Sequence, residues 1–472
     1  MLGINYCIKT LTLKQNILGF WRVVFQGVSA TAPAAVVSTI TAASVYAYGA
    51  VPLSFLIAFV GVLTTIVAIY QYSKKIAHAG GYYAYVSQSA GPFLGILTGF
   101  LLIGYQITDL AFIPLYFTVL FTFVLQFFAG IVLPTYIWVV VVIPVVLLWT
   151  VPPYLGIKPS LNYSIIFSVA EIAALVSVGV IIAVLSGPQN TAMVFTPTFS
   201  PTGIHGALLG GVFAITSFLG YGSVVTLGEE AKFPKKTISK ALLTNVLISG
   251  AFFLIVAYSY TIGWGPQNMA TMSSYLVPLA VEAKKIVGVG PALLITLFFI
   301  ESFFNSGLSF TNSAIRYFYG FSRDDHIIPK YFSKVHEKSG VPRRSLAVIT
   351  ISVLVLSIVF GFSFGPFMGF VLLATIATIF SLVVHIIVNS TVGLLYKREK
   401  EFNVLLHLII PLIASGLFAF IIYATVYPPS FPLTYMPIAA FIWAILSIVL
   451  ILIIRRRKPQ QYREAGTHST VE

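Results

Sequence analysis

Long apolar stretches, separated by short polar or charged segments, run through almost the whole chain. A helix needs roughly 20 mostly apolar residues to cross a bilayer. Windows of that length predict an all-α polytopic membrane protein with twelve transmembrane helices. The windows are residues 19–46, 51–72, 93–128, 132–152, 161–185, 206–227, 238–262, 289–318, 345–362, 367–395, 404–427 and 436–454.

The positive charges support this count. If the N-terminus is placed in the cytoplasm, every lysine and arginine except Lys284 and Lys285 falls in a segment on the cytoplasmic side. Loops that stay in the cytoplasm carry such an excess of Lys and Arg. We therefore expect an even number of spans, with both termini in the cytoplasm and the protein in the plasma membrane.

Composition excludes several classes of protein. Only 8% of the 472 residues are charged, against about 25% in a soluble domain. The net charge of +14 is explained by topology, so it does not indicate a nucleic acid partner. The single cysteine, Cys7, excludes an intrachain disulfide. We find no Walker-type phosphate loop and no metal-ligand spacing of histidines, which predicts no enzyme, no cofactor and no bound metal.

Two of the windows are interrupted by small residues and proline. The first contains a Gly-Val-Ser-Ala-Thr run followed by Pro33, and the sixth contains Gly220 and Gly222. Glycine costs a helix roughly 1 kcal/mol relative to alanine, and a broken membrane helix is tolerated only against protein or a water-filled cavity. The alternative is ordinary close packing of helices through small residues.

The spacing of the two interruptions favours a binding site. They fall five spans apart, in corresponding places of two five-helix halves, as an inverted-repeat transporter requires. Half-helix N-termini there would attract an anionic group such as a carboxylate. The candidate substrate-binding residues at the two breaks are Gly27, Val28, Ser29, Ala30, Thr31, Ser217, Phe218, Leu219, Gly220 and Tyr221.

Three acidic residues fall inside predicted spans, where charges are expensive and usually functional. Asp109 and Glu301 are candidates for substrate binding, and Glu171 is our candidate for proton coupling. Each has a structural alternative, a hydrogen bond to a neighbouring helix; for Glu301 the partner would be Asn305. Ser306 and Ser309 could instead bind sodium through their hydroxyl groups, although serine is also common in packed membrane helices.

Three runs of sequence resemble a known family. Residues 77–99 contain Ala-Gly-Gly-Tyr-Tyr-Ala-Tyr followed by spaced glycines, and residues 218–236 contain Phe-Leu-Gly-Tyr and later Glu-Glu-Ala-Lys-Phe-Pro-Lys-Lys. The third run begins at Asn312 and Arg316, continues through Ser322-Arg323-Asp324-Asp325 and ends in Val341-Pro342. In this order they are similar to signatures of the amino acid–polyamine–organocation (APC) transporters.

The resemblance implies a leucine-transporter-type fold of two inverted five-helix repeats, with helices one and six unwound at mid-membrane. The expected division is a cytoplasmic segment 1–18, repeats 19–186 and 187–396, helices eleven and twelve in 397–457, and a cytoplasmic tail 458–472. The family's helix-six glutamate is replaced by Gly222, and its helix-one triplet is only partly present. Recognition of a cationic side chain therefore loses its usual acid at that position.

The sequence thus predicts a secondary active transporter for amino acids or related amines, working by alternating access and driven by a proton or sodium gradient. The expected partners are a small-molecule substrate and the lipid bilayer, with no obligatory protein partner. The alternatives are a polyamine or organocation exchanger, and a non-transporting sensor or channel on the same scaffold. The Glu229-Glu230 pair is expected to form an ion-pair network rather than to bind substrate.

Overall fold

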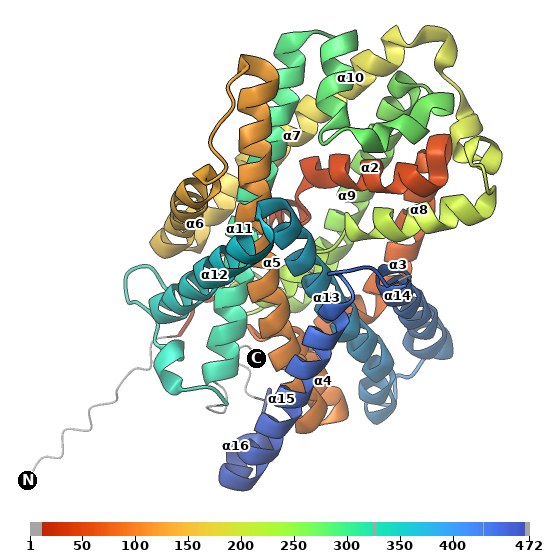
Figure 1. Ribbon diagram of the computed structural model, residues 1–472. Coiled ribbons are helices and arrows are strands. Elements are labelled where there is room, and N and C mark those ends of the chain that lie inside the picture. Colours follow the sequence, from red (N-terminus) through yellow and green to blue (C-terminus); the bar gives the residue numbers. More distant parts are fainter. Residues whose placement is uncertain (1–11, 324–326, 428, 468–472) are drawn as a thin grey trace, which may run out of the picture.

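The computed structural model describes residues 12–323, 327–427 and 429–467 (Figure 1). Cys7 and the Asp324-Asp325 pair of the third motif lie outside the described residues. The described part of the chain is helical, without a named strand. Its one β-type contact is an isolated parallel bridge between Leu18 and Ala231.

The first half of the chain contains helices α1 to α7. Their bounds are α1 Phe20–Ala30, α2 Val36–Ala47, α3 Val51–Lys75, α4 Tyr82–Ala90, α5 Pro92–Ala129, α6 Ile137–Leu155 and α7 Ile157–Leu185. Short 3-10 helices η1, Pro33–Ala35, and η2, Tyr48–Ala50, lie on either side of α2. Three more, η3 Gly187–Gln189, η4 Ala192–Phe195 and η5 Pro197–Phe199, follow α7.

The second half contains α8 to α16. Their bounds are α8 Ile204–Thr216, α9 Pro234–Trp264, α10 Pro278–Ile286, α11 Val289–Arg323, α12 Arg343–Phe364, α13 Pro366–Arg398, α14 Ile410–Val426, α15 Tyr435–Arg457 and α16 Pro459–Arg463. Between them lie the 3-10 helices η6 Tyr221–Leu227, η7 Pro266–Ser274 and η8 Lys330–Ser333, and a π-helical turn, η9 Leu405–Ile409.

Proline and glycine mark where many helices begin and end. Proline occupies the first turn of α5, α9, α13 and α14, where its missing N–H removes no helical hydrogen bond. Gly130, Gly156, Gly265 and Gly365 follow α5, α6, α9 and α12 with positive φ angles. Such a conformation ends a helix at little cost only for glycine.

Within the described residues, eleven helical runs are long and apolar enough to cross a membrane. The first of them, Phe20–Lys75, is 56 residues long and takes in both of the first two predicted windows. Many large apolar side chains on α6, α12, α14 and α15 are exposed, among them Leu148, Ile351, Leu412 and Phe441. An apolar exterior of this kind is suited to lipid, and the chain is a multi-pass membrane protein.

The arrangement brings the two interrupted regions together. Helix α2 lies against α8, and α1 contacts η6. The long helix α11 contacts α1, η1 and η6 in this region, and α5 packs against α11. Figure 1 shows α10 at one end of the bundle, with α4 and α16 at the other. Helix α10 packs on α11 and α9.

Candidate functional site

The first interruption separates α1 from α2. Helix α1 ends at Ala30, Ala32 has a left-handed backbone with φ 46°, and α2 begins at Val36. Pro33 stands between them and has no N–H to offer the preceding turn. The chain therefore changes direction here, and the carbonyl of Ala30 is free to accept a hydrogen bond of 3.2 Å from the Ser306 hydroxyl of α11.

The second interruption separates α8 from η6 and touches the first. Helix α8 ends at Thr216, and Gly220 has φ 108°. A Cβ atom added at Gly220 would lie 2.5 Å from the carbonyl oxygen of Ala30. Both the backbone conformation and this close approach require glycine at the position. The two breaks are thus in direct backbone contact.

A cavity of about 200 Å³ lies beside this contact; we call it the central cavity. It is lined by Ala30, Thr31, Ala32, Ala35, Ser38, Thr39, Tyr105, Asp109, Phe112, Ile113, Thr216, Ser217, Leu219, Phe303, Ser306, Phe310, Phe370, Ala374 and Thr378. These residues come from both breaks and from α5, α11 and α13. Mostly apolar walls with a few polar groups are typical of small-molecule sites.

Asp109 is the charged residue among those that line the central cavity. Its side chain lies on α5, and the residue is only 7% exposed. The Oδ2 atom has no hydrogen-bond partner among the described residues. Aromatic rings surround the same space, including Phe112 and Phe370, which contact each other edge to face with 5.6 Å between centroids. An acid inside an aromatic enclosure suits a positively charged nitrogen.

The other two intramembrane acids do not line this cavity. Glu171 of α7 accepts a hydrogen bond of 3.3 Å from the Ala34 N–H, just before α2 begins. Its Oε1 atom has no partner among the described residues, and neither oxygen of Glu301 has one. Glu171 and Glu301 interact electrostatically with each other, so α7 and α11 hold a pair of acids behind the first break.

Asn305 does not pair with Glu301. Its amide donates instead to the Ser168 hydroxyl of α7 at 3.1 Å. The predicted serines are bonded within the helix packing. Ser309 shares a hydrogen bond of 2.5 Å with Ser29, and Ser306 bonds to the Ala30 carbonyl.

Several candidate residues at the breaks lie in packed surroundings. Gly27 allows close contact with α9, since a Cβ there would lie 2.3 Å from the side-chain nitrogen of Asn245. Val28 is fully buried. Phe218 stacks on Phe59, with 6.2 Å between ring centroids.

Of the remaining candidates, Ala30, Thr31, Ser217 and Leu219 line the central cavity. Tyr221 shares a hydrogen bond of 3.2 Å with the Thr65 hydroxyl.

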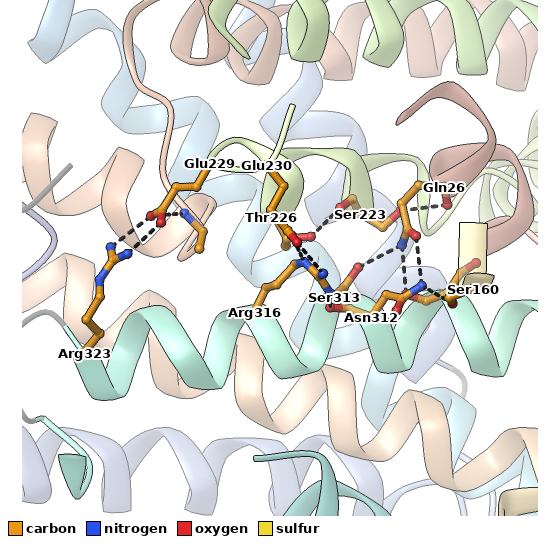
Figure 2. Close-up of polar contacts among 12 residues, drawn as sticks. Gln26, Ser160, Ser223, Thr226, Glu229, Glu230, Asn312, Ser313, Arg316 and Arg323 are labelled. Carbon is orange, nitrogen blue, oxygen red and sulfur yellow. Dashed lines mark hydrogen bonds and ion pairs between the residues drawn. The ribbon is translucent and has the colours of Figure 1, made fainter. Parts of the chain in front are cut away.

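Two buried ion pairs tie the segment after η6 to α11; we call Glu229, Glu230, Arg316 and Arg323 the ion-pair layer (Figure 2). Arg316 holds Glu230 through two nitrogens, one of them, Nη2, at 3.0 Å from Oε1. Arg323 contacts both oxygens of Glu229 at 2.6 and 2.9 Å. The expected ion-pair network is present, with arginines of α11 rather than the neighbouring lysines as partners.

Glu229 shows how the layer stabilises its charges. Burial alone would raise the pKa of this carboxyl, but the Arg323 guanidinium and the Ala79 N–H hold the pKa below its ordinary value. Two parallel bonds to a guanidinium are the strongest arrangement for a carboxylate. The carbonyl of Glu230 also accepts hydrogen bonds of 2.9 and 3.0 Å from Ile17 and Leu18, so the segment before α1 joins the layer.

A polar network continues from the layer toward the first break. Figure 2 shows Gln26 of α1 between η6 and α11. Its backbone carbonyl accepts from the Ser223 hydroxyl at 3.1 Å, and its side chain bonds to Ser313 and Asn312. Asn312 in turn donates to Ser160 of α7 at 2.7 Å. Four helical elements are therefore joined on this side of the central cavity.

Comparison with known proteins identifies the family. The sequence model of the amino acid permease family matches residues 23–463. The chain belongs to the amino acid permease family, within the APC superfamily. Members of this family are transporters rather than enzymes. No group of three or more His, Cys, Asp or Glu residues in the described ranges is placed to hold a metal ion.

Characterised relatives of the permease are distant. The low-affinity putrescine importer PlaP of Escherichia coli (strain K12) is 22% identical over 349 residues, which is 72% of this chain and 73% of the importer. The glutamate/serine transporter AimA of Bacillus subtilis (strain 168) is 24% identical over 190 residues, 40% of this chain and 34% of AimA.

The aspartate-proton symporter of the same organism is 24% identical over 284 residues, 57% of this chain and 53% of the symporter. The permease thus covers only part of the length of several relatives, about a third of AimA and about half of the symporter.

Proposed function

We propose that this permease carries amino acids or related amines across the plasma membrane by alternating access, with substrate bound in the central cavity. The observation that carries the proposal is that both helix interruptions meet at a cavity with one charged lining residue, Asp109. Interrupted membrane helices that enclose a mid-membrane site are typical of secondary transporters. Named relatives transport glutamate and serine, putrescine, or aspartate.

The proposal includes a twelve-span, inverted-repeat architecture. The 56-residue run Phe20–Lys75 is much longer than one crossing of roughly 20 residues, so we assign two crossings to it. The breaks at Ala32 and Gly220 then fall in spans one and six. With twelve spans and the Lys/Arg bias of the loops, both termini lie in the cytoplasm.

In this topology the ion-pair layer closes the cytoplasmic side. Glu229 and Glu230 connect the segment after η6 to α11, and Glu230 also binds the segment before α1. Opening toward the cytoplasm requires these contacts to separate. The described conformation therefore corresponds to a state closed on the inside, one of the two end states that alternating access needs.

For the driving ion we favour the proton, carried by Glu171. This carboxyl bonds to the Ala34 N–H at the restart of helix one, so a change in its protonation alters a contact at the break itself. The sodium alternative through Ser306 and Ser309 has weaker support, since both hydroxyls already bond to helix α1.

A specific observation also favours a second candidate, a polyamine or organocation exchanger. Asp109 lies among aromatic rings, and no lysine or arginine is among the residues that line the central cavity. This surrounding is better suited to an amine than to a free carboxylate. In a zwitterionic substrate the carboxylate would have to bind backbone N–H groups at the breaks.

Uptake by the purified protein in proteoliposomes tests the proposal. A panel of radiolabelled amino acids and diamines is offered under an imposed proton gradient, an imposed sodium gradient, or neither. Accumulation of at least one amino acid or amine under one gradient is expected. Stimulation only by substrate preloaded inside the vesicles would indicate exchange. Ion conductance without uptake, or binding without uptake, would replace the permease proposal with a channel or a sensor.

A further inference from the structure

A second, smaller space lies directly beside the central cavity. It has a volume of about 20 Å³, and we call it the polar chamber. Tyr105 and Phe310 line both spaces. Their rings meet edge to face with 5.8 Å between centroids, so this ring pair forms the wall between them. Reorientation of one ring would join the chamber to the central cavity.

Four buried polar atoms around the chamber have no hydrogen-bond partner among the described residues. They are Tyr82 Oη of α4, Gln106 Oε1 of α5, and Ser381 Oγ and His385 Nε2 of α13. All four residues are less than 10% exposed. Buried polar atoms are nearly always bonded to protein or to ordered water. Four such atoms from three helices around one small space indicate a shared ligand.

The chemistry of these atoms defines the ligand. His385 Nδ1 lies 2.7 Å from the Ser381 carbonyl oxygen, which can only accept, so Nδ1 carries a proton and, in the neutral imidazole, Nε2 is an acceptor. Gln106 Oε1 is also an acceptor. The two hydroxyl groups can donate or accept. The chamber therefore offers acceptors to a ligand that donates hydrogen bonds.

The orientation of His385 is fixed by its neighbours. Its ring contacts Tyr82, Tyr221 and Phe418, with centroids 5.4, 5.6 and 5.3 Å away. An imidazole held between three aromatic rings cannot turn to satisfy Nε2 elsewhere. The unpartnered acceptor consequently stays directed at the chamber.

The volume of the chamber and the charge of its lining residues further restrict which ligand it can hold. A cavity must offer at least about 10–15 Å³ to hold one water molecule, and the chamber offers about 20 Å³. Neither Asp, Glu, Lys nor Arg is among its lining residues. The nearest acid along α5 is Asp109, one helical turn from Tyr105, and it faces the central cavity. A small donor fits the chamber, whereas a whole amino acid does not.

We propose that the polar chamber is a second binding subsite, next to the central cavity, that takes one water-sized hydrogen-bond donor: a water molecule or an ammonium group. The occupancy of the chamber is independent of the transport function. A role for the chamber in passing an amine beyond Asp109 rests on the proposed function.

The first test measures stability. Gln106→Leu and His385→Phe each remove an acceptor and fill the space with apolar atoms. If a donor occupies the chamber, both variants lose its hydrogen bonds and unfold about 2 °C or more below a matched control. The control is His407→Phe, because His407 is also buried and, like His385, loses one hydrogen bond between Nδ1 and the backbone on substitution, but it does not line the chamber. If the chamber is empty, the two variants unfold at the same temperature as the control or above it.

The second test identifies the ligand directly. In full-length protein labelled with 15N-histidine, the His385 Nε2 resonance is assigned by its loss in His385→Phe. We expect the position of a hydrogen-bonded acceptor. A shift on titration with ammonium chloride, but not with potassium chloride, identifies an ammonium group; no shift with either salt, together with magnetisation transfer from solvent, identifies water.

Two results would overturn the proposal. One is a free, unbonded Nε2 resonance combined with variants as stable as His407→Phe. The other is an equal shift with potassium, which has the size of ammonium but no N–H to donate. Neither readout needs uptake, so a failure of the permease proposal in proteoliposomes leaves this test intact, and the reverse also holds.

Discussion

The charges of this permease fall into two groups with opposite surroundings. In the ion-pair layer, Glu230 and Arg316 are both buried and bind each other through two bonds. At or near the central cavity, Asp109, Glu171 and Glu301 each have at least one carboxyl oxygen without a partner in the described part of the chain. Paired charges hold helices together, whereas an unpaired buried acid needs a proton or a cation from outside. The comparison separates the charges that join helices from those that we propose to bind substrate or a proton.

The largest effect, a loss of folding stability, is expected when the ion-pair layer is broken. Glu230→Gln leaves the buried Arg316 without its charge partner, and the loss of one member of a buried pair costs about 3–5 kcal/mol. Thermal unfolding of the purified protein measures it.

The matched control is Lys75→Ala, which removes a partly exposed lysine paired with Glu399 and Glu401. It should cost less than about 1 kcal/mol. Equal effects of the two substitutions would remove the distinction between the buried layer and surface pairs.

The next effect concerns the unpaired acid of the central cavity. Asp109→Asn keeps the size of the side chain but removes its charge, so the substrate amine loses a charge-assisted hydrogen bond of about 1.5–3 kcal/mol. The substrate concentration for half-maximal uptake should rise roughly 10- to 150-fold, with little change in the unfolding temperature. Asp109→Glu, which keeps the charge, is the companion variant. Unchanged uptake by Asp109→Asn would show that the substrate amine binds elsewhere.

A smaller free-energy effect, on proton-driven accumulation, is expected from substitution of Glu171. With one proton per substrate, one unit of pH difference supports about tenfold accumulation, equivalent to roughly 1.4 kcal/mol. Glu171→Gln cannot take up a proton and should equilibrate substrate without accumulating it. Radiolabel accumulation in proteoliposomes with an imposed pH difference measures this. Accumulation by Glu171→Gln equal to that of the unaltered protein would assign the proton to another group; Glu301→Gln is the natural comparison.

The smallest effect is expected in α10, outside the spans. Burial raises the pKa of Glu282 well above its ordinary value, and both its oxygens lack partners among the described residues. Burial thus favours the protonated form, and the stability linked to this proton is present at low pH and is lost as pH rises through the raised pKa. The unfolding temperature should fall with rising pH in the unaltered protein.

Two substitutions test this dependence. In Glu282→Gln the decrease should be reduced, because an amide does not titrate. Glu337→Gln, at an exposed position, should keep it. If the unfolding temperatures of the unaltered protein and of Glu282→Gln change with pH in parallel, the prediction of a raised pKa for Glu282 is wrong.

The sequence predicts some parts of this site and not others, for physical reasons. Proline and glycine alter the backbone wherever they stand, so the interruptions at Pro33 and Gly220 can be found without coordinates. A charged residue in an apolar window is equally conspicuous, which is how Asp109 is found. In a chain with 39 Phe and 25 Tyr residues, however, composition cannot distinguish Phe310, which lines the cavity, from Phe218, which lies in the packed core.

The sequence also cannot predict residues whose role depends on which face of a helix is turned toward the cavity. Glu301 and Ser306 both lie on α11, yet only Ser306 reaches the central cavity, because neighbouring helices decide which face of α11 is turned toward it. Gln106 and His385 carry no motif, and only their unpartnered atoms around one small space mark them. The arginine partners of Glu229 and Glu230 are more than 80 residues away in the chain, beyond any local pattern.

The central claim is that substrate binds in the cavity where the two helix interruptions meet. A single cysteine at Ala35, which lines that cavity, tests it most directly in a Cys7→Ser background, since Cys7 is the only native cysteine. The rate of its reaction with a small, membrane-impermeant thiol reagent is measured with and without a transported amino acid or amine. We predict labelling from one side of the membrane that slows as substrate fills the cavity; labelling at the same rate with saturating substrate would contradict the claim.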